Sequence, residues 1–419
     1  MILSYEDRVV QRVEFAPAFA LFFGFSCAFF ALPVVGAVQI FLSHLIYITM
    51  IAFAGAYCAV MNPRFFGFFV MWLVVICALN LYSALNVGLG DRYASDIMKI
   101  LIYASSAAFV SHFLSLRTMT NIGFGLGIGL PMFIFVSVFA LGTISFTGGR
   151  LWLENAGGPN TFGAMLTLSM LMIISHQGKH IVVKALLLSV LLITLLSTGS
   201  RANLLGLLIA FLYGPQILKR ISIMGMVSLV LLLLVVVTID IDRLLDTLSG
   251  IERVVSITEG SDPSSGRVDI WANLIRDLLS TPQALLFGKG PGSAEIMSLR
   301  IFPVFWVKNL ASPHSTWVGS FYYFGIFGIT FLICMLIYLA IHVFRRGNLL
   351  QQRLFIYYMM VTPFDNHFIG SQGIVYHALA LAILFTNPSK VEPKRPVALD
   401  VMPRLSSSGD LAAAAGRGG

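Results

Sequence analysis

Residues 181–213 read IVVKALLLSVLLITLLSTGSRANLLGLLIAFLY, two apolar runs joined by the short polar turn from Ser197 to Arg201. Leu, Ile and Val fill both runs, and the few polar residues do not recur at the spacing of a soluble amphipathic helix. A helix that crosses a bilayer needs about 20 predominantly apolar residues, because the hydrocarbon core is about 30 Å thick. The stretch therefore predicts two membrane-spanning helices connected by a tight turn.

The composition of the whole chain also indicates a membrane protein. Hydrophobic residues make up 58% of the 419 residues and charged residues only 11%, whereas about 25% of residues are charged in a typical soluble domain. The formal net charge is +8, but the basic residues are not clustered on one polar segment, so nucleic-acid binding is not indicated. All four cysteines lie inside apolar runs, which argues against a disulfide framework.

Similar apolar runs recur along most of the chain and predict an all-α, polytopic integral membrane protein with about 12 transmembrane helices. The first run lacks a convincing cleavage site, so we expect a retained helix rather than a signal peptide. The runs occupy residues 15–33, 36–60, 65–83, 98–115, 122–145, 161–175, 181–197, 202–215, 221–239, 315–343, 350–362 and 371–386. The predicted divisions are spans 1–9 in residues 1–239, a helix-containing outer loop in 240–314, spans 10–12 in 315–386 and a disordered tail in 387–419.

The basic residues alternate between the predicted connections as the positive-inside rule requires. If the N-terminus is cytoplasmic, every even-numbered connection carries Lys or Arg, and the connections near 33–36 and 362–371 carry none. The basic residues on that side are Arg8, Arg12, Arg64, Arg117, Lys179, Lys184, Lys219, Arg220, Arg345, Arg346, Arg353 and those of the tail. Both termini are therefore predicted to be cytoplasmic. The long polar loop then lies on the outer side, which is the periplasm if the membrane is a bacterial inner membrane.

Arg201 lies on the predicted outer side, where topology does not favour a basic residue in a short turn. Gly199 can end one helix and Ser200 can begin the next, and a simple helix break is one interpretation of this turn. Charged residues at membrane depth are usually kept for function, however. The second interpretation is an anion site, formed by Arg201 and the unpaired N–H groups of the helix that starts there.

The long outer loop contains an amphipathic segment that starts at Arg267. Apolar residues recur at helical spacing until Thr281-Pro282 ends the pattern, and they are Val268, Trp271, Leu274, Ile275 and Leu278. We expect a helix of about four turns at the membrane surface. The helix macrodipole disfavours an Arg in the first turn. Arg267 is therefore either a solvated surface residue or one that binds an anion.

Two further outer segments carry candidate chemistry. The run Phe287-Gly288-Lys289-Gly290-Pro291-Gly292-Ser293 lacks the spacing of a phosphate-binding P-loop, so a turn is the simpler interpretation and a close approach to a ligand the alternative. His314 follows Pro313 directly before a strong apolar run, which places it at the outer membrane surface. It is either an ordinary interfacial residue or a base, since a neutral imidazole can accept a proton from a hydroxyl.

The order of these segments resembles the superfamily of O-antigen ligases and O-antigen or exopolysaccharide polymerases. The resemblance covers residues of about 155–330 in motifs, and the whole chain in span count and loop position. Ser315 departs from the pattern, because the family often has Asn after the His. The matching motifs are Gly158-Pro159-Asn160, Thr198-Gly199-Ser200-Arg201, Arg267-x-x-Ile270-Trp271, Gly288-x-Gly290-x-Gly292, and His314-Ser315 followed by Phe324-Gly325-Ile326-Phe327-Gly328.

The resemblance implies a metal-independent glycosyltransferase without a cofactor, acting in lipopolysaccharide or exopolysaccharide biosynthesis. Its donor would be a glycan on undecaprenyl diphosphate and its acceptor a sugar hydroxyl on another glycan. Arg201 and Arg267 would hold the leaving diphosphate, and His314 would orient or deprotonate the attacking hydroxyl. Further candidates for substrate contacts are Lys99, Arg150, Asn160 and Arg276.

Three functions remain open at this point. A polymerase that lengthens a lipid-linked glycan is favoured slightly by Ser312-Pro313-His314-Ser315 and the compact loop. An O-antigen ligase would hand the finished glycan to lipid A-core by the same chemistry. A transporter or flippase for the same lipids would place ionisable residues near the bilayer midplane. The glycine-rich run from Gly123 to Gly129 is the one feature that it would explain, and close helix packing explains that run as well.

Overall fold

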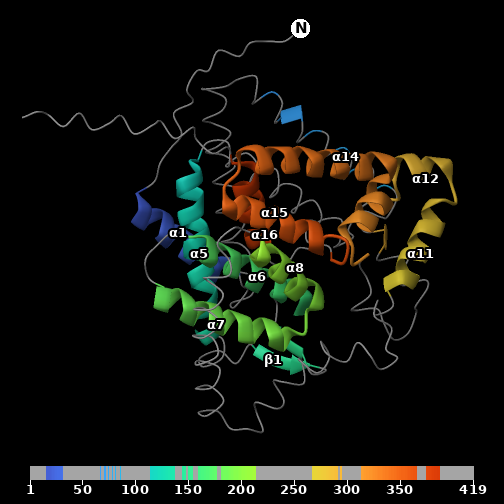
Figure 1. Ribbon diagram of the computed structural model, residues 1–419. Coiled ribbons are helices and arrows are strands. Elements are labelled where there is room, and N and C mark those ends of the chain that lie inside the picture. Colours follow the sequence, from blue (N-terminus) through green and yellow to red (C-terminus); the bar gives the residue numbers. More distant parts are fainter. Residues whose placement is uncertain are drawn as a thin grey trace, which may run out of the picture.

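A computed structural model of the chain describes residues 16–31, 114–136, 144–147, 150–153, 159–176, 181–213, 267–290, 293–294, 313–365 and 374–386, with isolated positions between 67 and 85. Helices make up the body of the molecule (Figure 1). Their bounds are α1 Pro17–Ala31, α5 Leu116–Val136, α6 Pro159–Ser175, α7 Ile181–Thr198, α8 Arg201–Leu212, α11 Arg267–Leu278, α12 Pro282–Phe287, α14 Thr316–Arg346, α15 Leu349–Val361 and α16 Ile374–Phe385. The predicted helical class is confirmed for the part of the chain that the structure describes.

Three of the described helices, α5, α7 and α14, are long and apolar enough to cross a membrane. The predicted spans at 15–33, 161–175, 202–215, 350–362 and 371–386 appear as the shorter helices α1, α6, α8, α15 and α16. The predicted spans at 36–60 and 221–239 lie outside the described residues, as do most of those at 65–83 and 98–115. The fold is therefore that of a helical membrane protein, and the number of spans stays a prediction.

The predicted span at 122–145 is displaced. It begins at Leu116 and ends at Val136, and Ile144–Thr147 then form strand β1, which pairs antiparallel with β2, Arg150–Leu153. The strand residues Ile144, Phe146 and Trp152 are β-branched or aromatic, and Gly148-Gly149 supplies the two-residue connection typical of a hairpin. This hairpin is the one departure from helix among the regular elements described.

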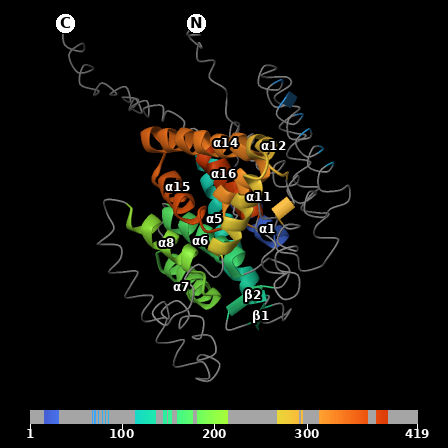
Figure 2. The same ribbon diagram turned by 90° about the vertical axis from the view of Figure 1, so that its right-hand side faces the viewer.

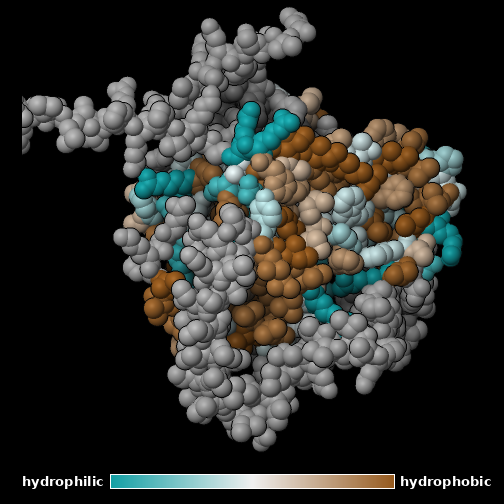
Figure 3. Space-filling view, viewed as in Figure 1, coloured by the Kyte–Doolittle hydropathy of each residue, from teal (hydrophilic) through white to brown (hydrophobic). Residues whose placement is uncertain are grey.

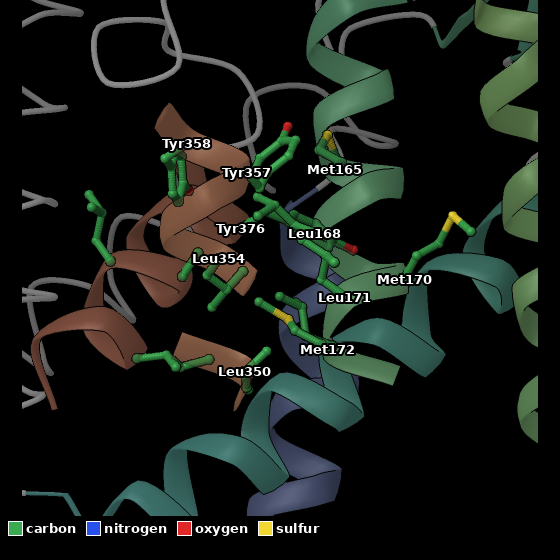
Figure 4. Packing of buried hydrophobic residues seen from close by; sticks show 14 of the residues in the cluster. Met165, Leu168, Met170, Leu171, Met172, Leu350, Leu354, Tyr357, Tyr358 and Tyr376 are labelled. Atoms are coloured by element: carbon green, nitrogen blue, oxygen red, sulfur yellow. The ribbon is translucent and has the colours of Figure 1, made fainter. Parts of the chain in front are cut away.

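The core of the bundle lies between α6 and α15. Figure 4 shows methionine and leucine side chains of α6 opposite leucine and tyrosine side chains of α15. Tyr357, Tyr358 and Tyr376 are all buried there. Buried tyrosines need hydrogen-bond partners, and the partner of Tyr357 helps to build the site described below.

The glycine-rich run of α5 lets three helices approach closely. A Cβ on Gly125 would lie 2.1 Å from the carbonyl oxygen of Leu21 in α1, and one on Gly127 would lie 3.0 Å from that of Ser169 in α6. Small residues on both faces of a helix permit this packing. The glycines that a transporter hypothesis would claim are therefore used for helix packing.

Helix α14 is kinked at Gly325, whose φ of 63° and ψ of −152° are not helical. The part before the kink is about 13 Å long and the part after it about 31 Å, at a rise of about 1.5 Å per residue. The second part alone matches the thickness of a hydrocarbon core. Hydrophobic side chains cover α14 along its length in Figure 3, as expected for a helix that faces lipid.

The helices of the bundle separate two ends. At one end, Arg353 Nη1 lies 3.4 Å from Ser175 Oγ, and Lys184 Nζ donates to the carbonyl oxygen of His176 at 2.5 Å. We call this the basic end, because the last turn of α14 adds Arg345 and Arg346 to it. Four of the residues predicted to be cytoplasmic, Lys184, Arg345, Arg346 and Arg353, thus lie at one end of the described bundle. The opposite end carries the candidate site.

Candidate active site at the starts of three helices

Arg201 is the first residue of α8 and follows a sharp break after α7. Gly199 has a φ of 59°, a conformation that favours glycine, and its N–H donates to the Leu196 carbonyl oxygen at 3.0 Å. Ser200 occupies the N-cap position. The predicted helix break is confirmed, and it leaves the half-buried Arg201 at a helix N-terminus, where the backbone favours an anion.

Asn203 holds the start of α8 against two other helices. Its amide Nδ2 donates to the carbonyl oxygen of Asn160 at 2.8 Å and to Ser200 Oγ at 2.8 Å. Its Oδ1 accepts a hydrogen bond from the hydroxyl of Tyr357 at 2.6 Å. Asn203 and Tyr357 are both 0% exposed. One buried amide therefore joins the first turns of α6 and α8 to α15.

The close contact of α8 with α15 continues along both helices. A Cβ on Gly206 would lie 2.7 Å from Val361 Cγ2 and 3.0 Å from Tyr357 Cδ2. No larger residue fits at position 206 unless one helix moves. Arg201 is thus placed by a rigid contact with α15, and the residues that follow α15 carry the rest of the site.

Arg267 is the first residue of α11, in agreement with its predicted place in the first turn, and reaches the turn that follows α15. Its Nη1 donates a hydrogen bond to the carbonyl oxygen of Phe364. Burial lowers the pKa of Arg267, and the nearby Asp365 carboxylate opposes this shift. The guanidinium stays charged in proteins at physiological pH. Arg267 is therefore a partly desolvated cation, a state that strengthens its attraction for an anion.

His314 lies between α11 and the start of α14, and both neighbours are held in place. Trp271 Nε1 donates to the Pro313 carbonyl oxygen at 2.7 Å. Ser315 is the N-cap of α14 and its side chain accepts from the Val318 N–H at 3.2 Å. His314 itself has a φ of 48°, a conformation uncommon for residues other than Gly, although Asn, Asp and His adopt it more often than the rest. Outliers of this kind cluster at functional sites.

The residues after α15 bind α11 and α14 at once. The Thr316 N–H points to the carbonyl oxygens of Thr362 at 2.9 Å and Asp365 at 3.1 Å, and its Oγ1 donates to the Asp365 carbonyl at 2.9 Å. The neighbouring Phe364 carbonyl accepts from Arg267. Residues 362–365, which we call the α15 turn, therefore hold Arg267 and the start of α14, two residues after His314, against one segment. Asn203 and Tyr357 connect Arg201 to the same helix.

The further candidates for substrate contacts do not all lie at this site. The Asn160 backbone belongs to the buried amide contact, whereas Arg276 is exposed near the far end of α11 and donates to Asn273 Oδ1 at 3.3 Å. Arg276 lies about 14 Å beyond Arg267 at a rise of about 1.5 Å per residue. Arg150 begins β2 opposite Thr147, and Lys99 lies outside the described residues. The structure thus brings Asn160 to the site and separates Arg276 from it.

The glycine loop packs against protein backbone. The N–H groups of Lys289 and Gly290 donate to the carbonyl oxygens of Tyr322 and Tyr323, at 2.9 and 3.1 Å. A Cβ on Gly288, which has a φ of 81°, would lie 2.2 Å from the Tyr323 carbonyl. The loop thus supplies donors to carbonyls just before the kink of α14, where the helical pattern stops. The turn interpretation is supported, and these two N–H groups do not point at a ligand.

A polar cluster that the sequence did not reveal locks α11 to α14. The Tyr322 hydroxyl donates to Asp277 Oδ2 at 2.6 Å, and Lys289 Nζ lies 3.4 Å from Asp277 Oδ1. Beneath it, the apolar face of α11 packs on Tyr322 and Tyr323. The amphipathic helix is confirmed, but its main apolar face covers α14 and not the lipid surface. Figure 2 shows α11 and α12 together on the face turned to the viewer.

The described residues contain no group of three or more His, Cys, Asp or Glu side chains arranged to hold a metal ion. Among the residues that the structure describes, this end of the bundle offers Arg201, Arg267, His314, Asp365 and several helix N-termini. Such a set can bind a charged phosphate group and accept a proton.

Part of the chain matches a known protein family. Residues 185–333 match the family described as O-antigen ligase. That segment contains Arg201, Arg267, His314 and the kink of α14. No curated protein matches the chain. The family indicates a membrane glycosyltransferase of the ligase or polymerase type, located in a bacterial inner membrane and handling lipid-linked glycans. Over this segment the chain is thus similar to the O-antigen ligases, which supports an assignment to the superfamily of O-antigen ligases and polymerases.

Proposed function

We propose that the protein transfers a glycan from undecaprenyl diphosphate to a sugar hydroxyl, and that it acts as a polysaccharide polymerase. The observation that carries the proposal is the α15 turn, which fixes the starts of α11 and α14 through Arg267 and Thr316. It sits on the helix that Asn203 joins to the start of α8. Following the alternation of charge, we place this end on the periplasmic side, with both chain termini in the cytoplasm.

In the proposed reaction, the acceptor hydroxyl oxygen forms a bond to the anomeric carbon of the donor sugar. The bond from that carbon to the diphosphate oxygen breaks, and its electron pair leaves with the diphosphate. The hydroxyl proton passes to the His314 imidazole, a step that contributes about 10²- to 10⁴-fold to the rate. Arg201 and Arg267 stabilise the departing negative charge by about 1.5–3 kcal/mol for each charge-assisted hydrogen bond. No step in this scheme requires a metal ion.

The polymerase assignment rests on Ser312-Pro313-His314-Ser315 and on a compact loop. Described parts of that loop, α11 and α12, pack closely on α14. The ligase alternative is favoured by the description of the matching family. The two functions differ in the acceptor, so the acceptor decides between them. The transporter alternative has lost its supporting feature, because Gly125 and Gly127 pack against α1 and α6.

The deciding experiment uses the purified full-length protein in lipid nanodiscs. It is incubated with undecaprenyl-diphosphate-linked repeat units, with and without lipid A-core. A ladder of longer lipid-linked chains in the absence of core supports the polymerase, and transfer to core alone supports the ligase. If neither product forms while labelled lipid crosses the bilayer of proteoliposomes, the transferase proposal is wrong.

A pair of variants on one helix tests the proposed donor site. Arg267→Ala is expected to lower transfer by at least about tenfold, since about 1.4 kcal/mol of transition-state stabilisation corresponds to one factor of ten. Arg276→Ala is the matched control, because Arg276 bonds only Asn273 of its own helix among the contacts described. We expect it to transfer at nearly the rate of the unmodified protein. Equal loss in both variants would show that the loop helix matters as a whole and not through Arg267.

A further inference from the structure

An exposed apolar surface continues from α14 onto the outer loop. Leu286 and Phe287 at the end of α12 are 44% and 50% exposed, and Ile326 and Phe327 just after the kink are 41% and 62% exposed. The rings of Phe287 and Phe327 stack, with centroids 5.6 Å apart. We call these four residues the α12 patch. Large apolar side chains gathered on a surface usually mark an interaction site.

The α12 patch is held firmly against the membrane-spanning part of α14. A Cβ on Gly325 would lie 2.4 Å from the Leu286 carbonyl oxygen, and the neighbouring glycine loop donates two hydrogen bonds to α14. Leu286 and Phe287 therefore lie beside the first turn of the part of α14 that follows the kink. A loop fixed in this way moves with the transmembrane helix.

The same exposed apolar face continues along α14 in the direction of the basic end. No Asp, Glu, Lys or Arg occurs from 326 to 344, and α14 is long and apolar enough to span a membrane. Its large exposed residues after the kink are Ile326, Phe327, Phe331, Ile333, Ile337, Tyr338, Ile341 and Phe344. The α12 patch is continuous with this face. The lipid that surrounds α14 can therefore also reach the patch.

The charged groups nearby lie on a different side of the loop. Lys289 follows α12 directly, but its ammonium group turns to Asp277 at 3.4 Å, and the Tyr322 hydroxyl points to the same carboxylate. Polar groups on one side and aromatic residues on the other are typical of a segment at the boundary between water and lipid.

We propose that the α12 patch inserts into the outer edge of the bilayer and anchors the loop to membrane lipid. The partner is the acyl-chain region of membrane phospholipid. The anchor is α12, and not the amphipathic helix α11, whose main apolar face is covered by Tyr322 and Tyr323. In this arrangement the lipid sets the height of the loop body that carries Arg267.

Spin labelling in proteoliposomes tests the anchor. In a protein whose other native cysteines are replaced by Ala, Cys334 on α14 is exposed and reports the lipid environment. With Cys334 also replaced, the label is placed at Phe287→Cys, at Leu286→Cys, or at Ala272→Cys on the exposed side of α11. Collision rates with oxygen, which enters lipid, and with a nickel chelate, which stays in water, are then measured for each label.

We expect the ratio of oxygen to nickel collisions at 286 and 287 to exceed the ratio at 272 several-fold and to approach that at Cys334. Nickel collisions at 286 and 287 equal to those at 272 would show that the patch faces water and overturn the proposal. Exclusion of both reagents would mean that protein covers the patch, which overturns it as well. The experiment uses no glycan substrate, so its outcome is independent of the proposed transfer reaction.

Discussion

Tyr357→Phe offers the most direct test of how the site is assembled, because it removes one hydroxyl and leaves the shape of the core intact. The hydroxyl lies 2.6 Å from Asn203 Oδ1, and both residues are 0% exposed. Losing the donor leaves a buried amide oxygen unpaired, which costs about 1–3 kcal/mol. Asn203 is then held by α6 and Ser200 alone, and Arg201, two residues away, is less firmly placed.

The loss of transfer rate in Tyr357→Phe cannot exceed the loss caused by removing Arg201 itself, if Tyr357 acts only by positioning Arg201. One charge-assisted hydrogen bond of about 1.5–3 kcal/mol corresponds to a rate factor of about 10 to 150. Arg201→Ala should show the whole of that factor and Tyr357→Phe a part of it. If Tyr357 acts through Arg201, adding Tyr357→Phe to Arg201→Ala should weaken the binding of labelled undecaprenyl diphosphate no further. A double-mutant cycle measures this coupling directly.

Tyr358→Phe is the matched control, one residue further along α15. Its hydroxyl is also buried and lies 3.0 Å from His377 Nδ1, a residue of α16 that lies outside the candidate site. Both variants should lower the thermal unfolding temperature in detergent, but only Tyr357→Phe should weaken donor binding. Equal weakening in both, or additive effects in the cycle with Arg201→Ala, would refute the proposed role of Tyr357.

Three other predictions follow from single contacts. Ser315→Ala should lower the free energy of unfolding by about 0.5–2 kcal/mol, because the N-cap of α14 is lost. Ser315→Asn should keep the stability of the unmodified protein, because Asn caps a helix as well as Ser does. Equal stability of the two variants in denaturant titrations would contradict this prediction. Gly325→Ala should destabilise the protein markedly in thermal melts, since its Cβ would lie 2.4 Å from the Leu286 carbonyl oxygen at a φ of 63°, and an unchanged melting temperature would exclude the packing of α12 described above. Burial, with the nearby charge of Lys184, lowers the pKa of His176 from its usual value of 6.5. The imidazole therefore binds a proton more readily in the unfolded chain than in the folded one, and the free energy of unfolding should fall as the pH drops below about 6.5. In pH-dependent denaturant titrations this fall should be smaller in His176→Gln.

Much of the local structure could be predicted because it follows from short-range rules. The start of α8 at Arg201 and that of α11 at Arg267 came from the turn Thr198-Gly199-Ser200 and from apolar spacing, and the structure confirms both. The hairpin was missed because the apolar run predicted at 122–145 includes the first two residues of β1, Ile144 and Ser145. The two-residue connection Gly148-Gly149 between alternating β-branched and aromatic residues could have revealed it.

The contacts that assemble the site could not be predicted in the same way. Asn203 and Tyr357 are separated by 154 positions, and nothing in either segment indicates the other. The same holds for Arg267 and Phe364, and for Asp277 and Tyr322. In the sequence, Asp277 is one of several polar residues between the apolar positions of the amphipathic segment. Its role in joining two helices depends on a fold that local patterns do not specify.

The placement of basic residues at helix starts has a physical consequence for the proposed donor. Arg201 and Arg267 each occupy the first position of a helix, and His314 directly precedes the start of another. A cation at that position is unfavourable, because the N-terminus of a helix already carries a partial positive charge. Two such starts, those of α8 and α11, each add a guanidinium to the partial positive charge of a helix N-terminus, and near Arg267 the Asp365 carboxylate opposes the resulting positive potential. An incoming diphosphate relieves this repulsion as it binds. The same potential then becomes most favourable when the glycosidic bond breaks, because negative charge on the diphosphate is greatest at that moment.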